Sequence, residues 1–276
     1  MAIASANSSE RLARVDLAGG DDAHNVLSVL GAEHSCGAGL FQYFDTVEAR
    51  GLRLVCHEFK AAVAAFPWDD APAACITADE YFTWWVKESR RTRIHRNLGA
   101  WRASFSRARS ANISVEYGAQ NSFTDADFVH LHGVRRFDMS FCSQKGITDA
   151  AFAHLEGLEV LNMAYCNQQS ITAAAFAHLA GIHTLSMSCC NQETITDAAF
   201  AHLAGIHTLN LNFCNQQTIT DAAFVHFAGI HTLNMSYCTQ RTITPAGLAP
   251  LRGAARIITD GCSAAITAAT ALLLTG

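Results

Sequence analysis

From Phe123 onward the sequence repeats itself every 24 residues. The two clearest units, Ile195–Thr218 and Ile219–Thr242, read ITDAAFAHLAGIHTLNLNFCNQQT and ITDAAFVHFAGIHTLNMSYCTQRT. One unit of this length cannot bury its own apolar side chains, so units with a strict period stack on one another. The period therefore predicts a solenoid for the second half of the chain. It also moves the question of function to the surface that the stack presents.

Each unit joins a helical pattern to a strand pattern. In ITDAAFAHL the apolar residues have helical spacing, with Thr196 placed as the N-cap and Gly205 following the last turn. In the following IHTLNLNFC, leucines alternate with Asn210 and Asn212, which we expect to point outward. The unit is thus predicted to contain a short helix and a short strand.

A cysteine ends the strand pattern of every unit. A residue that recurs once per repeat at this place is expected to be a small inward-facing side chain whose thiol bonds to the backbone. We therefore predict free buried thiols and a reducing, intracellular compartment, cytoplasmic or nuclear, rather than a disulfide framework. The residues are Cys142, Cys166, Cys190, Cys214, Cys238 and Cys262.

The pattern I-x-x-L-x-L/M-x-x-C resembles the leucine-rich repeat, and more narrowly its cysteine-containing class. Residues 111–122, ANISVEYGAQNS, match the strand half of a unit with Gly118 in the cysteine position, and a decayed repeat covers 243–265. The resemblance implies an α/β solenoid with a parallel β-sheet on its concave face and short helices or turns on its convex side. Complete repeats begin at Phe123, Ile147, Ile171, Ile195 and Ile219.

In such a stack, equivalent residues form columns about 5 Å apart on the concave face. Small polar groups beside aromatic side chains suit a protein partner, because aromatic residues carry much of the energy of protein interfaces. The alternatives are solvation of the sheet for the polar rows and bracing between repeats for the aromatic column. The partner-binding candidates are Asn162, Ser186, Asn210 and Asn234; Ser188, Asn212 and Ser236; Tyr165, Phe213 and Tyr237; and His183, His207 and His231.

Further columns are interpreted as structural. The glutamines are expected to form an amide ladder that pairs backbone groups of the loops. The convex-side histidines run parallel, whereas a metal needs ligands that converge on one point, so neither a metal site nor a cofactor is predicted. These columns are Gln144, Gln168, Gln192, Gln216 and Gln240, and His130, His154, His178, His202 and His226.

Basic residues gather in the first half of the chain. Sixteen of the 19 Lys and Arg residues lie at or before Lys145, and the net charge is −5. The run from Arg90 to Arg109, with Trp84, Trp85 and Trp101, has two interpretations. It is a nucleic-acid patch or an N-terminal cap whose aromatic residues cover the first repeat. We favour the cap, so a nucleic-acid partner is not predicted.

Residues 40–68 contain two short apolar helix patterns closed by a tryptophan. This segment resembles the F-box, the motif that docks onto the Skp-type adaptor of SCF ubiquitin ligases. The resemblance implies a Skp-type adaptor and a cullin ligase as partners. The matching residues, which it makes candidates for adaptor binding, are Leu40, Phe41, Phe44, Leu52, Val55, Cys56, Phe59 and Trp68.

The expected organisation is a flexible tail at 1–22, an F-box-like helical module at 23–70, a linker and cap at 71–110, the solenoid at 111–265 and a C-terminal cap at 266–276. We expect Leu272, Leu273 and Leu274 to close the stack, although so thin a cap also leaves a surface for end-to-end association of an otherwise monomeric protein. No run of 18 apolar residues predicts a membrane span, and the first residues lack the pattern of a secretory leader.

Three functional hypotheses follow. The first is a non-catalytic substrate receptor of an SCF-type ubiquitin ligase, whose F-box holds the adaptor while the repeats bind an unknown target protein. The second is a leucine-rich-repeat scaffold in which the F-box-like helices are only a cap. The third is a surface array in which rows of Asn and Ser bind a polymer or order water. No catalytic motif is present in the sequence, so enzymatic activity is not predicted.

Overall fold

The structure is a computed structural model that describes residues 41, 45–53, 57–69, 94, 97–114 and 122–275. The chain forms two compact units, Met1–Phe44 and Asp45–Gly276. In the first unit only Phe41 is described; it is helical and 5% exposed. The tail predicted at 1–22 lies outside the described residues.

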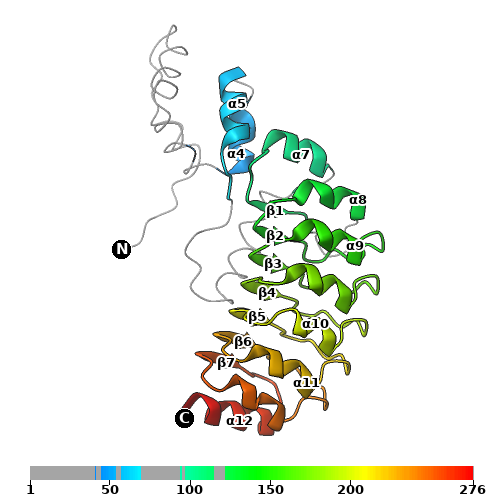
Figure 1. The fold of residues 1–276 in the computed structure, drawn as a ribbon, viewed down its shortest axis with the longest axis vertical. Helices are drawn as coiled ribbons and strands as arrows, with labels where there is room; N and C mark the ends of the chain where they lie inside the picture. The colour runs from blue at the N-terminus through cyan, green and yellow to red at the C-terminus, as the bar shows by residue number, and fades with distance from the viewer. Residues whose placement is uncertain are drawn as a thin grey trace. The chain divides into compact units, whose positions relative to one another are not determined.

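The second unit is built around one open sheet of seven parallel strands in sequential order, which is the leucine-rich-repeat solenoid fold expected from the sequence (Figure 1). From β2 onward each strand residue pairs with the residue 24 positions later in the next strand, as Thr184 does with Thr208. The strands are β1 (Ser110–Asn112), β2 (Arg136–Asp138), β3 (Val160–Asn162), β4 (Thr184–Ser186), β5 (Thr208–Asn210), β6 (Thr232–Asn234) and β7 (Arg256–Ile258).

The first strand departs from the expected register. Ser110 pairs with Arg136, so β1 lies 26 residues before β2 and not 24. The predicted alignment of this strand is therefore wrong, and Gly118, which it placed at the cysteine position, lies outside the described residues. The register aligns two residues that make the same hydrogen bond. The Asn112 side chain accepts from the N–H of Ser114, and Asp138, its partner in the next strand, accepts from the N–H of Ser140.

Short helical segments lie along one face of the sheet (Figure 1). Repeats with Asp directly after the N-cap threonine begin with an α-helix, because a carboxylate favours the positive end of the helix dipole. Where Ala173 or Pro245 replaces this Asp, the segment is a 3₁₀ helix. The segments are α8 (Asp125–Phe128) with η1 (Val129–Leu131), α9 (Asp149–Phe152) with η2 (Ala153–Leu155), η3 (Ala173–Leu179), α10 (Asp197–Ala201), α11 (Asp221–Phe224) with η4 (Val225–Phe227), and η5 (Ala246–Leu251).

The core lies between the sheet and these helices, and every full repeat contributes the same set of buried residues. In the repeat from Ile195, the side chains of Phe200 and Leu209 are completely buried. The thiol of Cys214 donates to the carbonyl of Met187 in the preceding repeat at 2.9 Å. All six repeat cysteines make this bond, at 2.9–3.3 Å. Five of the thiols are buried as predicted, whereas Cys262 in the last repeat is only half-buried.

Neighbouring repeats are also joined by a contact that we call the Asp–Thr clamp. The carboxylate that follows one N-cap accepts hydrogen bonds from the N–H and the hydroxyl of the N-cap threonine in the next repeat. For Asp197 and Thr220 the two distances are 2.8 and 2.6 Å. Ala173 leaves Thr196 without this carboxylate. The other clamps join Asp125 to Thr148, Asp149 to Thr172 and Asp221 to Thr244.

The helices α4 (Thr46–Leu52), α5 (His57–Ala65) and α7 (Leu98–Ser104) precede the sheet. The guanidinium of Arg102 donates to the carbonyls of His130 and His132, so it ties α7 to the first helical segment of the stack. Burial lowers the pKa of Arg102. Of the basic run, Arg107 and Arg109 are exposed, while Arg90, Arg91, Arg93 and Arg96 lie outside the described residues.

The last element is the helix α12 (Ala264–Thr275), which begins two residues before the predicted cap. Its buried residues are Ile266 and Thr270. Leu272 is 74% exposed and Leu274 is exposed as well, so the prediction that these leucines close the stack is wrong. A continuous helix turns successive side chains by about 100°, and neighbouring leucines cannot all face one surface.

Candidate binding surface

The first polar row, formed by the last residue of each strand, is not accessible to a partner. Asn162, Ser186, Asn210 and Asn234 are all buried, contrary to the prediction. The amide oxygen of Asn210 turns back and accepts from the N–H of Asn212 at 3.0 Å, and Asn162 and Asn234 make the same bond. This bond holds the chain where the strand ends, so the row is structural. Its burial also removes the main row of the surface-array hypothesis.

The second polar row is only partly accessible. Ser188 and Asn212 are half-buried, and the Ser188 hydroxyl donates to the carbonyl of Asn212 in the next repeat. Ser236, predicted to contact a partner, is buried. A partner would thus meet this row at two of its three predicted residues.

The next column, which we call the aromatic rail, consists of Phe141, Tyr165, Cys189, Phe213 and Tyr237. All five have φ between 57° and 61°, a left-handed conformation that is uncommon outside glycine. Each N–H is held by a carbonyl of the following repeat, as Tyr165 is by Ser188 at 2.8 Å. The turn after each of the strands β2 to β6 therefore imposes this conformation, and the rail side chains project from the C-terminal ends of these strands.

The rings of the rail form two stacks. The rings of Phe141 and Tyr165 lie 4.4 Å apart and 8° from parallel, and those of Phe213 and Tyr237 lie 4.5 Å apart and 1° from parallel. Tyr165 and Phe213 are each 42% exposed, and Tyr237 is 47% exposed. The prediction left binding and bracing open for this column. The rings do stack between repeats, and they also remain accessible.

The rail ends at Gly261, which occupies the equivalent place after β7. Its φ is 69°, and a Cβ there would lie 2.4 Å from the ring of Tyr237. A side chain at Gly261 would therefore collide with the last ring.

A histidine row lies at the opposite ends of the strands. It consists of the residues directly before β4, β5 and β6, which are His183, His207 and His231. Their rings stack with centroids 4.4 Å apart, and all three are exposed. The Nδ1 of each histidine lies 3.0–3.1 Å from the hydroxyl of the next threonine. Burial, followed by the charges of His183 and His231, lowers the pKa of His207. These three predicted residues are thus brought together on an accessible edge.

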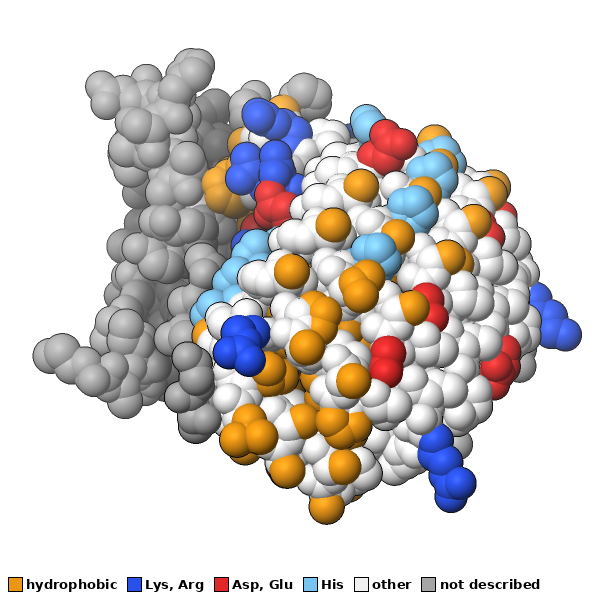
Figure 2. All heavy atoms as spheres, turned by 60° about the horizontal axis from the view of Figure 1, so that its bottom comes forward, with side chains coloured by type: hydrophobic (Ala, Val, Ile, Leu, Met, Phe, Trp, Pro, Cys, Tyr) orange, Lys and Arg blue, Asp and Glu red, His pale blue; other side chains and the backbone are white. Residues whose placement is uncertain are grey.

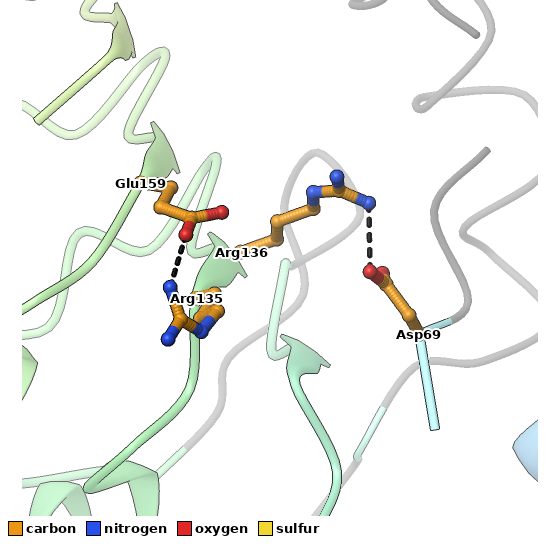
Figure 3. Close-up of polar contacts among 4 residues, drawn as sticks. All are labelled: Asp69, Arg135, Arg136 and Glu159. Carbon is orange, nitrogen blue, oxygen red and sulfur yellow. Dashed lines mark hydrogen bonds and ion pairs between the residues drawn. The ribbon is translucent and has the colours of Figure 1, made fainter. Parts of the chain in front are cut away.

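Charged residues replace histidine in the same column at the N-terminal end of the sheet. Arg135 forms an ion pair with Glu159, and Arg136 pairs with Asp69 at 2.8 Å (Figure 3). The second pair ties the segment after α5 to β2. Elsewhere charged side chains are sparse on the face that Figure 2 shows.

The loop and helix-side columns differ in outcome. The predicted glutamine ladder is wrong: both polar atoms of the Gln168, Gln192 and Gln216 amides are buried and have no hydrogen-bond partner among the described residues. A neighbouring column supplies the ladder instead, since the Asn167 oxygen accepts from the N–H of Asn191, and Asn191 from that of Asn215, at 2.6 Å. The asparagine side chains, which are shorter than the glutamines, therefore pair with the backbone N–H groups of the next repeat. Within the described ranges, no cluster of three His, Cys, Asp or Glu could hold a metal ion.

The adaptor-binding candidates are only partly described. Trp68, predicted to contact the adaptor, is 1% exposed. Its ring lies edge-on to Phe105, 6.1 Å away, and its indole N–H donates to the carbonyl of Val63 at 2.6 Å. Trp68 therefore joins α5 to the cap. Phe41 is also buried. Leu40, Phe44, Val55 and Cys56 lie outside the described residues, as do the side chains of Leu52 and Phe59.

The cysteines differ sharply in their surroundings. Burial raises the pKa of Cys166, Cys190 and Cys214 well above the usual thiol range, and raises that of Cys238 to about 12. Cys189, in the rail, is half-buried.

We expect iodoacetamide at pH 8 to modify Cys189 at least about tenfold faster than the adjacent Cys190, because alkylation requires an accessible thiolate. Peptide mass spectrometry of the native chain measures both rates, and the same labelling in urea is the control in which the two thiols should react alike. Equal rates in the native chain would contradict the structure.

Neither a protein-family model nor a curated protein matches the chain. Solved structures do match it. The Toll-like receptor of the TLR13–ssRNA13 complex is 20% identical with a TM-score of 0.47, over 56% of this chain and 22% of that chain. The Toll–Spatzle complex of Drosophila is 14% identical with a TM-score of 0.46, over 62% and 25%. Internalin C2 of Listeria monocytogenes is 18% identical with a TM-score of 0.41, over 55% and 62%. The chain thus spans about a quarter of the two receptor structures. None of the described helices is long and apolar enough to cross a membrane.

Proposed function

We propose that this chain is a non-catalytic binding protein whose solenoid holds a partner protein along the aromatic rail and the histidine row. The observation that carries the proposal is the exposure of Tyr165, Phe213 and Tyr237, between 42% and 47%. Exposed aromatic rings held in a fixed conformation are typical centres of protein interfaces. The left-handed turn fixes these rings before a partner arrives, which lowers the entropy cost of binding.

Charge supports a protein partner over a nucleic acid. Between Ile147 and Thr242 the only Lys or Arg is Arg241. Nucleic-acid binding draws most of its affinity from Lys and Arg contacts to phosphates. The same range holds six Asp or Glu residues, so these repeats carry a net negative charge, which repels phosphates. They offer ring edges, hydroxyls and imidazoles to a protein surface instead.

The more specific proposal is that the protein is the substrate receptor of an SCF-type ubiquitin ligase. It rests on the F-box-like residues around α4 and α5. The contacts of α5 add support: the Ser106 hydroxyl donates to the carbonyl of Ala64, and the N–H of Arg109 donates to that of Trp68. A receptor needs such a joint, because its target must be held at a fixed place relative to the adaptor.

Affinity capture with quantitative mass spectrometry tests both levels. Four tagged chains are compared in a lysate of the source organism: the natural chain, the rail variant Tyr165→Ser/Phe213→Ser/Tyr237→Ser, the helix variant Leu40→Asp/Val55→Asp, and the control Val129→Ser/Val225→Ser on exposed helix-side positions. We expect the rail variant to lose a set of proteins at least about tenfold, because three interface centres are removed. We expect the helix variant to lose a Skp-type adaptor and its cullin.

The outcomes separate the hypotheses. Rail-dependent proteins without any adaptor would favour the scaffold, with the F-box-like helices serving as a cap. Capture that is identical for the rail variant and the natural chain would contradict the binding role itself.

A further inference from the structure

The aromatic rail is interrupted at its centre. Cys189 has φ of 58°, within the range of the four ring-bearing positions, and its N–H is held by the carbonyl of Asn212 at 2.8 Å, as theirs are by the equivalent carbonyls. The backbone at this position is therefore built to present a ring, and the side chain supplies a thiol instead. The interruption is a property of one side chain and not of a local distortion.

The missing ring leaves a gap of defined width. Tyr165 and Phe213 belong to repeats two steps apart, and parallel strands are about 4.8 Å apart, so their rings are separated by about 9.5 Å. Two stacking distances of the kind seen at 4.4 and 4.5 Å in the flanking pairs fill that span. One planar ring thus fits between Tyr165 and Phe213 with a stacked neighbour on each face. We call this gap the ring slot.

The walls and floor of the ring slot are accessible. Tyr165 uses one face against Phe141, and Phe213 uses one face against Tyr237, yet both remain 42% exposed. The Cys189 side chain lies within reach of the Tyr165 phenol, because a hydrogen bond with it, followed by burial, raises the pKa of Tyr165. The Ser188 hydroxyl, 3.8 Å from the Cys189 sulfur, adds a polar group at the rim.

We propose that the ring slot takes one aromatic side chain of a partner protein between Tyr165 and Phe213. The proposal rests on the binding role for its biological meaning and names the group by which the partner is recognised. Aromatic rings at stacking distance gain energy beyond the area they bury, and a ring held on both faces gains it twice. Between Ile147 and Thr242 the only Lys or Arg is Arg241, so the repeats of Tyr165, Cys189 and Phe213 have no basic side chain to neutralise the phosphate of a nucleotide. A neutral side chain is the better occupant.

The test uses N-acetyl-L-tryptophanamide as the probe and the full chain labelled with ¹³C-tyrosine. The chain has five tyrosines, and Tyr165→Phe identifies the signal of Tyr165. We expect a saturable upfield shift at Tyr165 from the ring current of the bound indole. Tyr237 is an internal control, because its ring faces Gly261 and offers only one stacking surface. Half-saturation at Tyr165 should need about 2- to 10-fold less probe than at Tyr237, since the second stacked face contributes about that factor.

Cys189→Phe gives the decisive comparison. Phenylalanine already occupies the same backbone conformation at Phe141 and Phe213, so the new ring should fill the slot and abolish the Tyr165 response. Cys189→Ser leaves the slot open and should respond within about twofold of the natural chain. Phe213→Ala, which removes an exposed wall, should weaken the Tyr165 response to the level that Tyr237 shows in the natural chain, and it decides the matter if Cys189→Phe does not fold.

Three results would overturn the proposal: equal half-saturation at the two tyrosines, a Tyr165 response unchanged by Cys189→Phe, or saturation of Tyr165 by adenosine at lower concentration than by the tryptophan probe. N-acetyl-L-leucinamide should produce no saturable shift. If the rail variant loses its captured proteins while the probe fails, the binding role stands and only the ring slot is wrong.

Discussion

Replacing Phe200 by alanine is expected to lower the free energy of unfolding by about 3–5 kcal/mol. Phe200 is completely buried in the middle of the stack, and its ring lies 5.5 Å from Phe227 and 6.4 Å from Phe176. The repeats on both sides are full-length and hold their own phenylalanines in place, so they cannot close around the cavity. A loss of this size is a large part of the 5–15 kcal/mol that stabilises an ordinary domain.

Urea unfolding followed by circular dichroism measures this loss. Val225→Ala, at a 56% exposed position one repeat further on, is the matched control and should change the free energy by less than about 0.5 kcal/mol. In a solenoid each repeat contacts only its neighbours, so Phe200→Ala should also separate the transition into two phases on either side of the damaged repeat. A loss below about 1 kcal/mol would mean that this part of the core is not packed as described.

Removing one Asp–Thr clamp is expected to cost about 1–3 kcal/mol, because two half-buried donors lose their charged acceptor. In Asp197→Ala, the N–H and the hydroxyl of Thr220 lose acceptors at 2.8 and 2.6 Å. The chain also contains the reverse experiment. Ala173 stands where the other full repeats have Asp, and Ala173→Asp should supply Thr196 with the missing acceptor and raise the stability by about 1 kcal/mol.

Both variants are read by the same urea titration, with Glu193→Ala at an exposed position as the control that should change little. Opposite signs for Asp197→Ala and Ala173→Asp are the expected result. If the two variants leave the midpoint unchanged, the clamp holds no more than an exposed polar contact would.

Much of the solenoid follows from local pattern. The cysteine and leucine positions point inward as predicted because strand geometry alternates side chains between two faces. Thr196 occupies the predicted N-cap position but its side chain makes no cap hydrogen bond, whereas the equivalent Thr220 accepts from the N–H of Ala222. The aromatic column and the histidine row were also found from spacing alone. Their stacking follows from a 24-residue period that places like rings one strand apart.

The candidate site was harder to predict than the fold. Alternation says that Asn210 points away from the leucines, but it does not say that its amide turns back to the N–H of Asn212 and is buried. Gln216 and Asn215 stand side by side in the same loop, and which amide reaches the neighbouring repeat depends on the turn. The adaptor contacts of the F-box-like segment stay a proposal; there Trp68 proved to be a buried joint.

By itself the sequence determined the repeat, the parallel order of the strands, the inward thiols and the scarcity of Lys and Arg in the repeats, because each follows from a period or a composition that the units share. The tertiary structure decided which of the outward columns is accessible. It decided the register of β1, the burial of the asparagine row and the exposure of the rail. The physical reason is that these depend on hydrogen bonds between repeats at the turn after each strand. Those bonds impose the left-handed conformation of the rail, and no pattern within one repeat specifies them.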